Sequence, residues 1–549
     1  MEATKAWNTL ETDRKARLQR ALTLSDGKVV QPEDARALLE TVIRPGDRVC
    51  IEGNNQKQAD FLSKALASVD PSLIHDLHLV QSVVGLDEHL DLFAKGIAKK
   101  LDFAFSGPQA KRLAEYVQNG KIQLGAIHTY LELYARYCLD LTPRVALVAA
   151  EAADRHGNLY TGPNTEDTPI VVEATQFKQG IVIAQVNRLV DELPRVDIPG
   201  DWVDFVIPAP TPYYLDPLFT RDPAKIGPTQ ILMAMMALKL YEEYGVKKLN
   251  HGIGYATAAI ELILPTYGKE LGLLGKVATH WALNPHPTLI PAIESGFVEA
   301  IHSFGSEVGM EQYIQARPDV FSIGPDGNMR SNRMICQAIG HYGIDLFIGA
   351  TMQIDEDGNS STATKGRISG FGGAPNMGTN AGGRRHWTEA WGKMGEGYGF
   401  GRALDGEMPR GRKLVVQMLE TKHSKGPNFV EKLDAWELAE TAGLPLPPVM
   451  IYGSDLTHII SEEGIAYLYR AESLEERRKA IRAIAGDTPL GRKSTPEEKE
   501  EMRRKGLVKT PEDLGVDRSR ATRELLAAKD LADLVRWSGG LYQIPSKFA

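Results

Sequence analysis

The chain has 549 residues, of which 43% are hydrophobic and 24% are charged, and its formal net charge is -8 at pH 7. A chain of this length is too long for one hydrophobic core, so two or more domains are expected. The balance of apolar and charged residues is typical of a soluble globular protein. The acidic net charge argues against nucleic acid as the main partner, although a local basic patch can still form.

Cysteine usage and the N-terminus bear on the cellular compartment. Cys50, Cys138 and Cys336 stand far apart and form no CxxC pair, which suits small buried thiols in a reducing compartment. Residues 1–20 are charged and lack the apolar core of a signal peptide. No apolar run approaches the roughly 20 residues that span a membrane. We therefore expect a cytoplasmic protein with no membrane span, and we assign no metal ligands.

The first half of the chain alternates predicted strands and helices. Residues 1–45 are predicted to be helical and polar, as a surface arm. A strand is predicted at residues 47–51, followed by a small polar loop and a helix over residues 57–67, which together make one α/β unit. The segments expected to follow as strands are 77–84, 101–105, 145–150, 170–173, 180–187 and 202–207.

A proline-rich segment separates the two halves. Six prolines fall in the stretch from Pro208 to Pro228, which is typical of a linker between domains. After it, Ile231, Met235 and Leu238 recur at helical spacing. A helix is therefore predicted to open the second half.

The second half repeats the pattern of the first. The matching pairs of segments are 249–254 with 49–55, 321–326 with 103–108, and 355–359 with 154–158. We predict an α/β fold with two tandem homologous open α/β domains, covering residues 1–225 and 226–549. Ligands of open α/β sheets bind beyond the carboxyl ends of the strands, so a cleft between the domains is expected to hold the substrate.

The last hundred residues differ in composition from the rest. Residues 461–464 are predicted to open a helix, and residues 472–520 are rich in charge. Stretches of this kind are typical of solvated helices. The second domain is therefore expected to end in a helical, charged C-terminal region.

A glycine-rich loop follows the buried strand that is predicted at residues 346–352. Its glycines include Gly370, Gly372, Gly373 and Gly378. Such a loop exposes backbone N–H groups and lets a ligand lie against the main chain. Arg384 and Arg385 follow and supply positive charge for a developing oxyanion. An ordinary turn explains loop glycines equally well, and a dinucleotide fingerprint fits poorly because Pro375 interrupts the helix that it requires.

Several of these segments resemble a known superfamily. Residues 250–254, the strand before Met352 and the loop at 370–373 resemble the second domain of family I CoA transferases. Glu173, with the stretch 180–194 after it, resembles the end of the first domain in that superfamily. Within it, the alpha-subunit family of malonate decarboxylases is the nearest resemblance, and the alpha subunits of citrate lyase are more distant. The segments that resemble the narrower family are 52–59 (EGNNQKQA), 308–316 (VGMEQYIQA) and 368–378 (ISGFGGAPNMG).

The resemblance implies two CoA-transferase-like domains and acyl exchange on an acyl carrier protein. A chain of this family would replace acetyl by malonyl on the carrier thiol, with malonate consumed and acetate released. That thiol ends a phosphoribosyl-dephospho-CoA arm, which the carrier holds covalently, so this chain itself would bind no cofactor. Other subunits would then decarboxylate the malonyl thioester. The implied partners are the carrier protein and those decarboxylase subunits.

One position departs from the superfamily pattern. CoA transferases place a catalytic glutamate at a strand end early in the second domain, and alignment brings that position to Leu283. The run 279–287 (THWALNPHP) contains no carboxylate. Because leucine cannot attack a thioester, we expect malonate's own carboxylate to attack directly and to form a mixed anhydride.

The resemblance and the loop chemistry together suggest roles for single residues. Backbone N–H groups near Gly372 and Gly373 are expected to stabilise the oxyanion, with Asn284 as a further donor or as a turn residue. Arg384 and Arg385 are expected to pair with malonate's second carboxylate or with an arm phosphate. The residues expected to hold the arm are Gly53, Asn54, Asn55, Gln56, Lys57, Gly252 and Gly254. Three further residues are interpreted as structural, namely His280, His286 and Glu307.

Three other functions stay open on the sequence. A transferase like the citrate lyase alpha subunit would use the same chemistry on another acid. A free CoA transferase or acyl-CoA hydrolase would need an acid near Leu283, which the sequence lacks. A non-catalytic scaffold that only docks the carrier would have no use for aligned backbone donors in the glycine loop.

Overall fold

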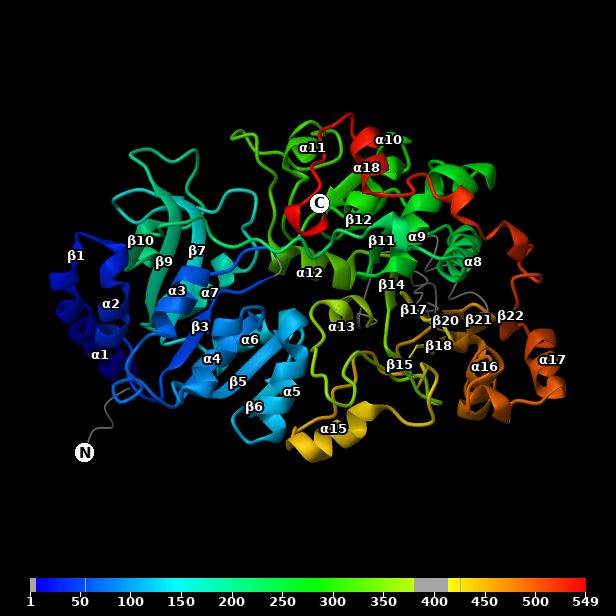
Figure 1. The fold of residues 1–549 in the computed structure, drawn as a ribbon, viewed down its shortest axis with the longest axis horizontal. Helices are drawn as coiled ribbons and strands as arrows, with labels where there is room; N and C mark the ends of the chain where they lie inside the picture. The colour runs from blue at the N-terminus through cyan, green and yellow to red at the C-terminus, as the bar shows by residue number, and fades with distance from the viewer. Residues whose placement is uncertain (1–5, 55, 380–412, 425) are drawn as a thin grey trace, which may run out of the picture.

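The computed structural model describes residues 6–54, 56–379, 413–424 and 426–549. Its strands divide into two large sheets, the first built from β1 to β10 and the second from later strands. In Figure 1 the N-terminal half, blue to cyan, and the C-terminal half, green to red, lie beside each other, with helices around each sheet. The α/β fold class with two such units is confirmed. A domain boundary between residues 225 and 226 stays a prediction.

The first sheet has the order β1-β2-β10-β9-β7-β3-β4-β5-β6, with β8 beside β7. All of its pairs are parallel except β1 with β2 and β7 with β8. The central strand β7 reads VALVAAEAA, the near-continuous apolar run expected of a parallel strand covered on both faces. The strands are β1 (Ser25–Asp26), β2 (Val29–Val30), β3 (Arg48–Ile51), β4 (Leu77–Val83), β5 (Ala98–Phe105), β6 (Gln123–Ile127), β7 (Val145–Ala153), β8 (Leu159–Tyr160), β9 (Ile181–Leu189) and β10 (Phe205–Pro208).

Helices cover both faces of the first sheet and create two separate hydrophobic cores. Seven helices belong to the described part of this half: α1 (Ala6–Ala21), α2 (Ala35–Val42), α3 (Asp60–Leu66), α4 (Asp87–Ala94), α5 (Ala110–Gln118), α6 (Tyr130–Leu139) and α7 (Thr168–Phe177). Helix α6 packs against α7 and, across the two halves, against α12 of the second half (Arg333–Tyr342).

The N-terminal segment is part of the fold rather than a surface arm. Helix α2 buries Ala35, Leu38, Leu39 and Val42, an apolar stripe at helical spacing that faces the first core. Strand β2 adds to the sheet edge through the parallel pairing of Val29 with Val206 of β10. The prediction of a polar surface arm over residues 1–45 is therefore wrong. Some apolar residues of this segment form the buried stripe of α2, and others form strand β2 of the sheet.

The segment expected as a strand at residues 170–173 forms the middle of helix α7 instead. Its β-branched residues favour a strand by intrinsic propensity. Pro169, however, lies in the first turn of the helix, where its fixed φ is tolerated, and Val171, Val172 and Thr175 pack into the protein. Tertiary packing against α6 therefore overrides a weak local preference.

The second sheet has the order β13-β12-β11-β14-β17-β20-β21-β22. Its first five pairs are parallel, and β21 and β22 add antiparallel to one edge. The strands are β11 (Lys248–His251), β12 (His280–Ala282), β13 (Ala300–His302), β14 (Leu346–Ala350), β17 (Leu414–Met418), β20 (His458–Ser461), β21 (Gly464–Tyr467) and β22 (Val508–Lys509). Two small antiparallel pairs lie outside it: β15 (Gln353–Ile354) with β16 (Ser360–Ser361), and β18 (Lys422–His423) with β19 (Gly426–Pro427).

Two predictions for the second half are wrong. Residues 461–464 do not open a helix but form the tight turn between β20 and β21, where Ser461 pairs with Gly464. Two apolar runs separated by only two residues are typical of a β-hairpin, and that pattern prevails over the acidic pair between them. Residues 321–326, which the repeat matches to the predicted strand end and loop at 103–108, form no strand, since Phe321 and Ile323 make only isolated bridges before a turn.

The C-terminal region has the predicted charged helices, but these also have buried faces. Helices α16 and α17 pack against each other and bury Ala480, Ile481 and Met502 in one core. The helices of this half within the described residues are α8 (Pro228–Tyr244), α9 (Tyr255–Ile263), α10 (Ile290–Glu294), α11 (Glu311–Gln315), α12 as above, α13 (Ala374–Met377), α15 (Asp434–Ala442), α16 (Leu474–Ala483), α17 (Pro496–Arg504) and α18 (Leu531–Trp537). None of the described helices is both long enough and apolar enough to cross a membrane.

Candidate active site

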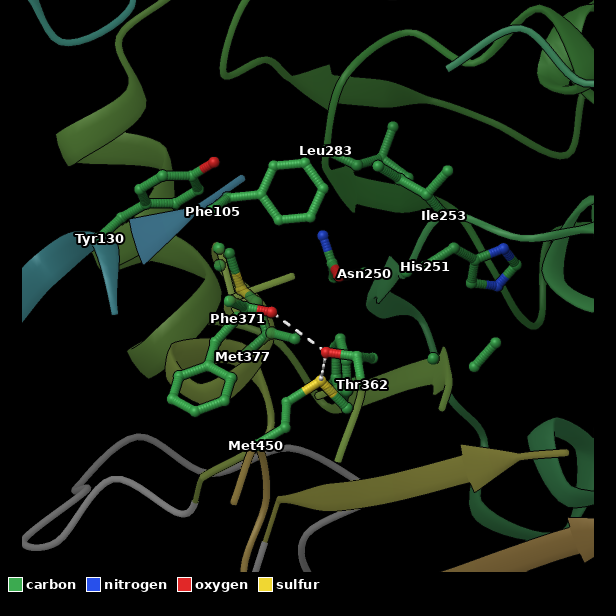
Figure 2. Close-up of a pocket in the computed structure, with 18 of the residues that line it drawn as sticks. Phe105, Tyr130, Asn250, His251, Ile253, Leu283, Thr362, Phe371, Met377 and Met450 are labelled. Atoms are coloured by element: carbon green, nitrogen blue, oxygen red, sulfur yellow. Dashed lines mark hydrogen bonds between the residues drawn. The ribbon is translucent and has the colours of Figure 1, made fainter. Parts of the chain in front are cut away.

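A cavity of about 320 Å³ lies where loops from both halves meet. Phe105, at the end of β5, and Tyr130, at the start of α6, come from the first half, and Leu218 and Phe219 come from the linker. Figure 2 shows Phe105 reaching toward Leu283 of the second half. The cleft between the two halves that the sequence predicts therefore exists in the described structure.

The remaining walls follow the carboxyl ends of three adjacent parallel strands. Gly252 follows β11, Leu283 follows β12, and Ala350 ends β14. Gly252 allows β11 and β14 to continue side by side, because an added Cβ there would lie 2.9 Å from the Gly349 Cα. The cavity thus occupies the position where open parallel sheets bind their ligands.

The glycine loop closes the cavity and docks onto the first half. The N–H groups of Phe371 and Gly372 both donate to the Ala104 carbonyl, at 2.8 and 3.0 Å. Gly370 has φ +70°, and an added Cβ would lie 2.4 Å from that same carbonyl, so only glycine fits. The Gly372 N–H is therefore already engaged in a structural hydrogen bond. Among the described residues the Gly373 N–H has no acceptor.

The position aligned with the catalytic glutamate is apolar in the structure as well. Leu283 is 1% exposed and lines the cavity, and the Asn284 side chain beside it donates to the Ser306 carbonyl at 3.4 Å. The described lining residues include two cations, Arg333 and Arg367, and neither an aspartate nor a glutamate. A covalent acyl-glutamate therefore has no residue on which to form in the described walls.

Three serine and threonine hydroxyl groups of the cavity donate hydrogen bonds to backbone carbonyl oxygens. Thr362 Oγ1 donates to the Gly370 carbonyl at 3.1 Å, a contact drawn as a dashed line in Figure 2. Ser369 Oγ donates to the Thr362 carbonyl at 2.8 Å. Thr351 Oγ1 donates to the Ser361 carbonyl at 3.0 Å. None of these three hydroxyls bonds to a base that would make it a nucleophile.

The cysteines offer no alternative nucleophile in the described cavity walls. Cys50 and Cys336 are buried elsewhere and Cys138 is exposed. Burial raises the pKa of Cys336 to about 12, so its thiol stays protonated. The described residues also hold no cluster of three or more histidine, cysteine, aspartate or glutamate side chains suited to a metal ion.

His286 and His251 share one buried carboxylate. The Nδ1 atoms of the two rings lie 3.1 and 3.0 Å from Glu261 Oε1. Burial raises the pKa of Glu261, but the two imidazoles outweigh burial and lower it to about 2. His286 also stacks on Phe219, with ring centroids 5.4 Å apart. This bonding fits the structural role interpreted for His286. The His280 Nδ1 atom lies 2.9 Å from Thr279 Oγ1, which fits a structural role as well.

The loop predicted to hold the arm lies beside a second cavity, of about 280 Å³. Asn54 lines this cavity, and its Oδ1 accepts from the backbone N–H groups of Gln56 and Lys57. Lys57 itself is 0% exposed, with Nζ 3.1 Å from Glu52 Oε1 and 2.5 Å from Thr168 Oγ1. Its ammonium therefore already has a carboxylate partner inside the first half.

The other predicted site residues are placed differently. Gly53 lies outside both cavity walls, and an added Cβ there would lie 2.7 Å from the Val83 carbonyl. Gly254 precedes helix α9 and does not line the cavity, whereas Gly252 does. The two cavities are adjacent, since Phe105 and Leu218 contribute to both. Asn55, Arg384 and Arg385 lie outside the described residues.

Sequence reasoning missed two cavity residues of helix α12. Arg333 and Gln337 are four residues apart and line the cavity from one helix face. Arg333 is 1% exposed, its Nε donates to Glu166 Oε2 at 2.8 Å, and its guanidinium lies over the Tyr130 ring at 4.7 Å. Their spacing was visible in the sequence, but no motif marks it.

Comparison with known proteins decides the family. The sequence profile described as "Malonate decarboxylase, alpha subunit, transporter" matches residues 6–549. The chain belongs to this family. It is 63% identical over 551 residues to the acetyl-S-ACP:malonate ACP transferase of Malonomonas rubra, with both chains fully covered. It is 59% identical to a chain in the crystal structure of a Pseudomonas malonate decarboxylase hetero-tetramer in complex with malonate, with a TM-score of 0.96 and full coverage of both chains.

More distant structures have the same fold as this member of the malonate decarboxylase alpha-subunit family. The alpha subunit of citrate lyase from Streptococcus mutans has a TM-score of 0.59 at 15% identity, covering 84% of this chain and 86% of its own. The acyl-CoA transferase YdiF from Escherichia coli O157:H7 has a TM-score of 0.51 at 16% identity, covering 79% and 87%. These matches place the fold with the CoA transferases, as the sequence resemblance predicts.

Proposed function

We propose that this chain is an acyltransferase that exchanges acetyl for malonyl on the thiol of an acyl carrier protein, with acetate as the second product. One observation carries the proposal. The cavity at the glycine loop contains two arginines and, among its described lining residues, no carboxylate. Such a cavity suits an anionic co-substrate that performs its own attack. The name of the Malonomonas rubra relative supports the same exchange.

The proposed reaction has two acyl-transfer steps and needs no proton. A carboxylate oxygen of malonate attacks the acetyl carbonyl carbon, and the carbon–sulfur bond breaks with its electron pair leaving on the thiolate. The product is the mixed anhydride of acetate and malonate. The thiolate then attacks the malonyl carbonyl, the carbon–oxygen bond breaks, and acetate leaves. The protein's contribution is to align the two reactants and to stabilise each oxyanion.

The site roles follow from this reaction. Gly373 and Asn284 are proposed as donors near the reacting carbonyl, and Gly372 contributes only if its bond to Ala104 opens. Arg384 and Arg385 are proposed for malonate's second carboxylate or an arm phosphate, in company with Arg333 and Arg367. The proposed arm contacts remain Gly53, Asn54, Asn55, Gln56, Lys57, Gly252 and Gly254.

The proposed substrate and partners extend beyond this chain. The arm is the phosphoribosyl-dephospho-CoA group of the carrier, so it arrives as part of the substrate. The hetero-tetramer that contains the Pseudomonas relative supports assembly with decarboxylase subunits. Three unpaired cysteines support a cytoplasmic location.

Mass spectrometry of the carrier tests the proposal. Acetylated carrier is incubated with this chain and malonate, and we expect the acetyl form to become malonyl with release of acetate. An unchanged carrier would favour the scaffold, and a free thiol would favour a hydrolase. Parallel incubations with citrate in place of malonate distinguish a citrate lyase-like transferase, which would form a citryl carrier, from the proposed malonate enzyme. Borohydride treatment during turnover should reduce no glutamate, and a reduced side chain would refute direct attack by malonate.

A further inference from the structure

Gln337 is a buried amide at the glycine loop whose donor end has no partner in the described part of the chain. Its side chain is 1% exposed and lines the cavity. Its Oε1 accepts a hydrogen bond from Asn376 Nδ2 at 3.1 Å, which fixes how the amide is oriented. Among the described residues its Nε2 has no hydrogen-bond acceptor. Because Gln337 lines the cavity, this donor can bond to an acceptor that the substrate supplies.

The free amide nitrogen lies directly against Gly373. A Cβ added to Gly373 would lie 2.4 Å from Gln337 Nε2, so residue 373 must be glycine for the amide to occupy this place. Gly373 needs no unusual backbone conformation, since its φ is -88°. Side-chain space, rather than backbone strain, therefore requires a glycine here. The Gly373 N–H is also without an acceptor in the described structure.

We propose that Gln337 Nε2 and the Gly373 N–H together donate to the oxyanion that forms on the thioester carbonyl. This inference rests on the proposed acyl transfer. It replaces the predicted pair Gly372 and Gly373, because the Gly372 N–H is bonded to the Ala104 carbonyl. Two fixed donors directed at one oxygen form the standard arrangement for stabilising a tetrahedral acyl intermediate. Asn376 acts through Gln337 and is a positioning residue.

Helix α12 gives this donor a favourable electrostatic setting. Arg333 lies one turn before Gln337 on the same face and also lines the cavity. Its charge is balanced by Glu166, so the pair adds an oriented dipole at the cavity wall rather than a free cation. The amide is neutral and needs no change of protonation during the reaction, which suits a step in which negative charge appears and disappears on one oxygen.

The decisive variant is Gln337→Met, which keeps the length of the side chain and removes the donor. We expect kcat for malonyl formation on acetylated carrier to fall about 10²- to 10³-fold, with little change in the KM for carrier. Gln417→Met is the matched control, because Gln417 is a buried amide of β17 that lines neither cavity and whose side chain has no hydrogen-bond partner among the described residues. The Gln417→Met chain should exchange acetyl for malonyl at the wild-type rate.

A second variant keeps the inference falsifiable if Gln337→Met folds poorly. Gln337→Glu preserves shape, and its carboxyl can donate only when protonated, so its exchange rate should rise as the pH falls relative to wild type. A purely structural role for Gln337 would not produce that profile. A folded Gln337→Met chain with wild-type kcat, or a Gln337→Glu profile parallel to wild type, would overturn the inference. If the wild-type chain itself forms no malonyl carrier, the proposed function fails instead.

Discussion

Leu283 is the residue on which the proposed choice between two mechanisms depends. It directly follows strand β12, where the superfamily resemblance predicts a glutamate, and it is almost fully buried in the cavity wall. Without a nucleophilic side chain there, the proposed mechanism has the co-substrate carboxylate attack the thioester itself. Catalysis then depends on alignment and on oxyanion donors, and these are the contributions that a rigid glycine loop can make.

Gly373→Ala tests the space around the glycine loop. The added methyl group meets the Gln337 amide, with contacts of 2.4 to 3.0 Å that only a displaced amide can relieve. We expect the exchange rate to fall roughly 10²-fold or more while the melting temperature changes little, because the backbone φ accepts alanine. Gly268→Ala is the control, since its added Cβ makes only ordinary contacts of 3.5 and 3.6 Å. Equal rates for the two variants would place the oxyanion donors elsewhere.

Lys57 belongs to a buried ion pair, which changes what its removal should do. Lys57→Met leaves the fully buried Glu52 carboxylate without its cation, and burial already raises the pKa of Glu52 to about 7. Breaking a buried pair in this way costs about 3–5 kcal/mol of unfolding free energy, measured by urea titration. Adding Glu52→Gln should restore part of the loss.

Lys64→Met is the matched control, because the Lys64 ammonium is exposed and its pair with Asp60, at 3.6 Å, should contribute about 0–1 kcal/mol. The same variants decide the predicted role of Lys57 toward the arm. A Lys57→Met chain of normal stability that binds carrier poorly at low salt, and less so at high salt, would support the phosphate contact instead.

At the level of elements, strands with long apolar runs could be predicted from the sequence, whereas an element fixed by tertiary packing could not. Strands β3, β4, β7, β9 and β14 were predicted because each is an apolar run that ends at a turn signal. Helix α7 was missed because packing outweighs the strand preference of its β-branched residues.

The candidate site was predicted only in outline. The glycine loop and Leu283 were found because each belongs to a recognisable pattern. The contact of Gln337 with Asn376 and the pairing of Lys57 with Glu52 depend on side-chain direction, which neither pattern nor resemblance reveals. The hydrogen bond between Gly372 and Ala104 joins residues from the two halves of the chain, so no local sequence pattern predicts it.

Helix α12 joins the two halves through Arg333 and Glu166. Burial raises the pKa of Glu166, and Arg333 opposes that effect. Arg333→Met should therefore cost about 3–5 kcal/mol of stability, and a double variant with Glu166→Gln should recover much of it. The double variant should still show a raised KM for malonate, because Arg333, although paired with Glu166, lines the cavity and is proposed to contact a substrate anion.

Arg317→Met provides the comparison for that measurement. Arg317, a partly exposed residue of the same half, pairs with both Asp319 and Glu294. Because solvent screens these pairs, the loss of Arg317 should cost less stability than the loss of Arg333. A double variant at positions 333 and 166 with unchanged malonate kinetics would show that Arg333 is purely structural.

On the scale of the whole molecule, one buried carboxylate connects three parts of the chain. Glu307 of the second half accepts hydrogen bonds from Gln56 Nε2 of the first half at 2.7 Å and from the linker N–H groups of Phe219 and Thr220 at 3.1 and 2.9 Å. The Thr220 hydroxyl adds a fourth bond at 2.8 Å. The interpretation of Glu307 as a turn residue thus understates its part in fixing the two halves around the cavity.

The protonation of Glu307 should make the stability of the whole chain depend on pH. Burial raises its pKa to about 8, against the opposing effect of the four hydrogen bonds. Between about pH 4.5 and 8 the folded chain therefore retains a proton that the unfolded chain has released. The free energy of unfolding then decreases as the pH rises through this window, by at most about 1.4 kcal/mol per pH unit from this group.

Glu307→Gln removes the titration and keeps an oxygen to accept the linker N–H groups. We expect its melting temperature to fall less than that of the wild-type chain between about pH 5 and 9, so that the two curves converge or cross at the alkaline end. Glu299→Gln, at an exposed glutamate of the same half, should follow the wild-type curve. If the Glu307→Gln curve also ran parallel to wild type, Glu307 would be ionised throughout, and its four donors would outweigh its burial.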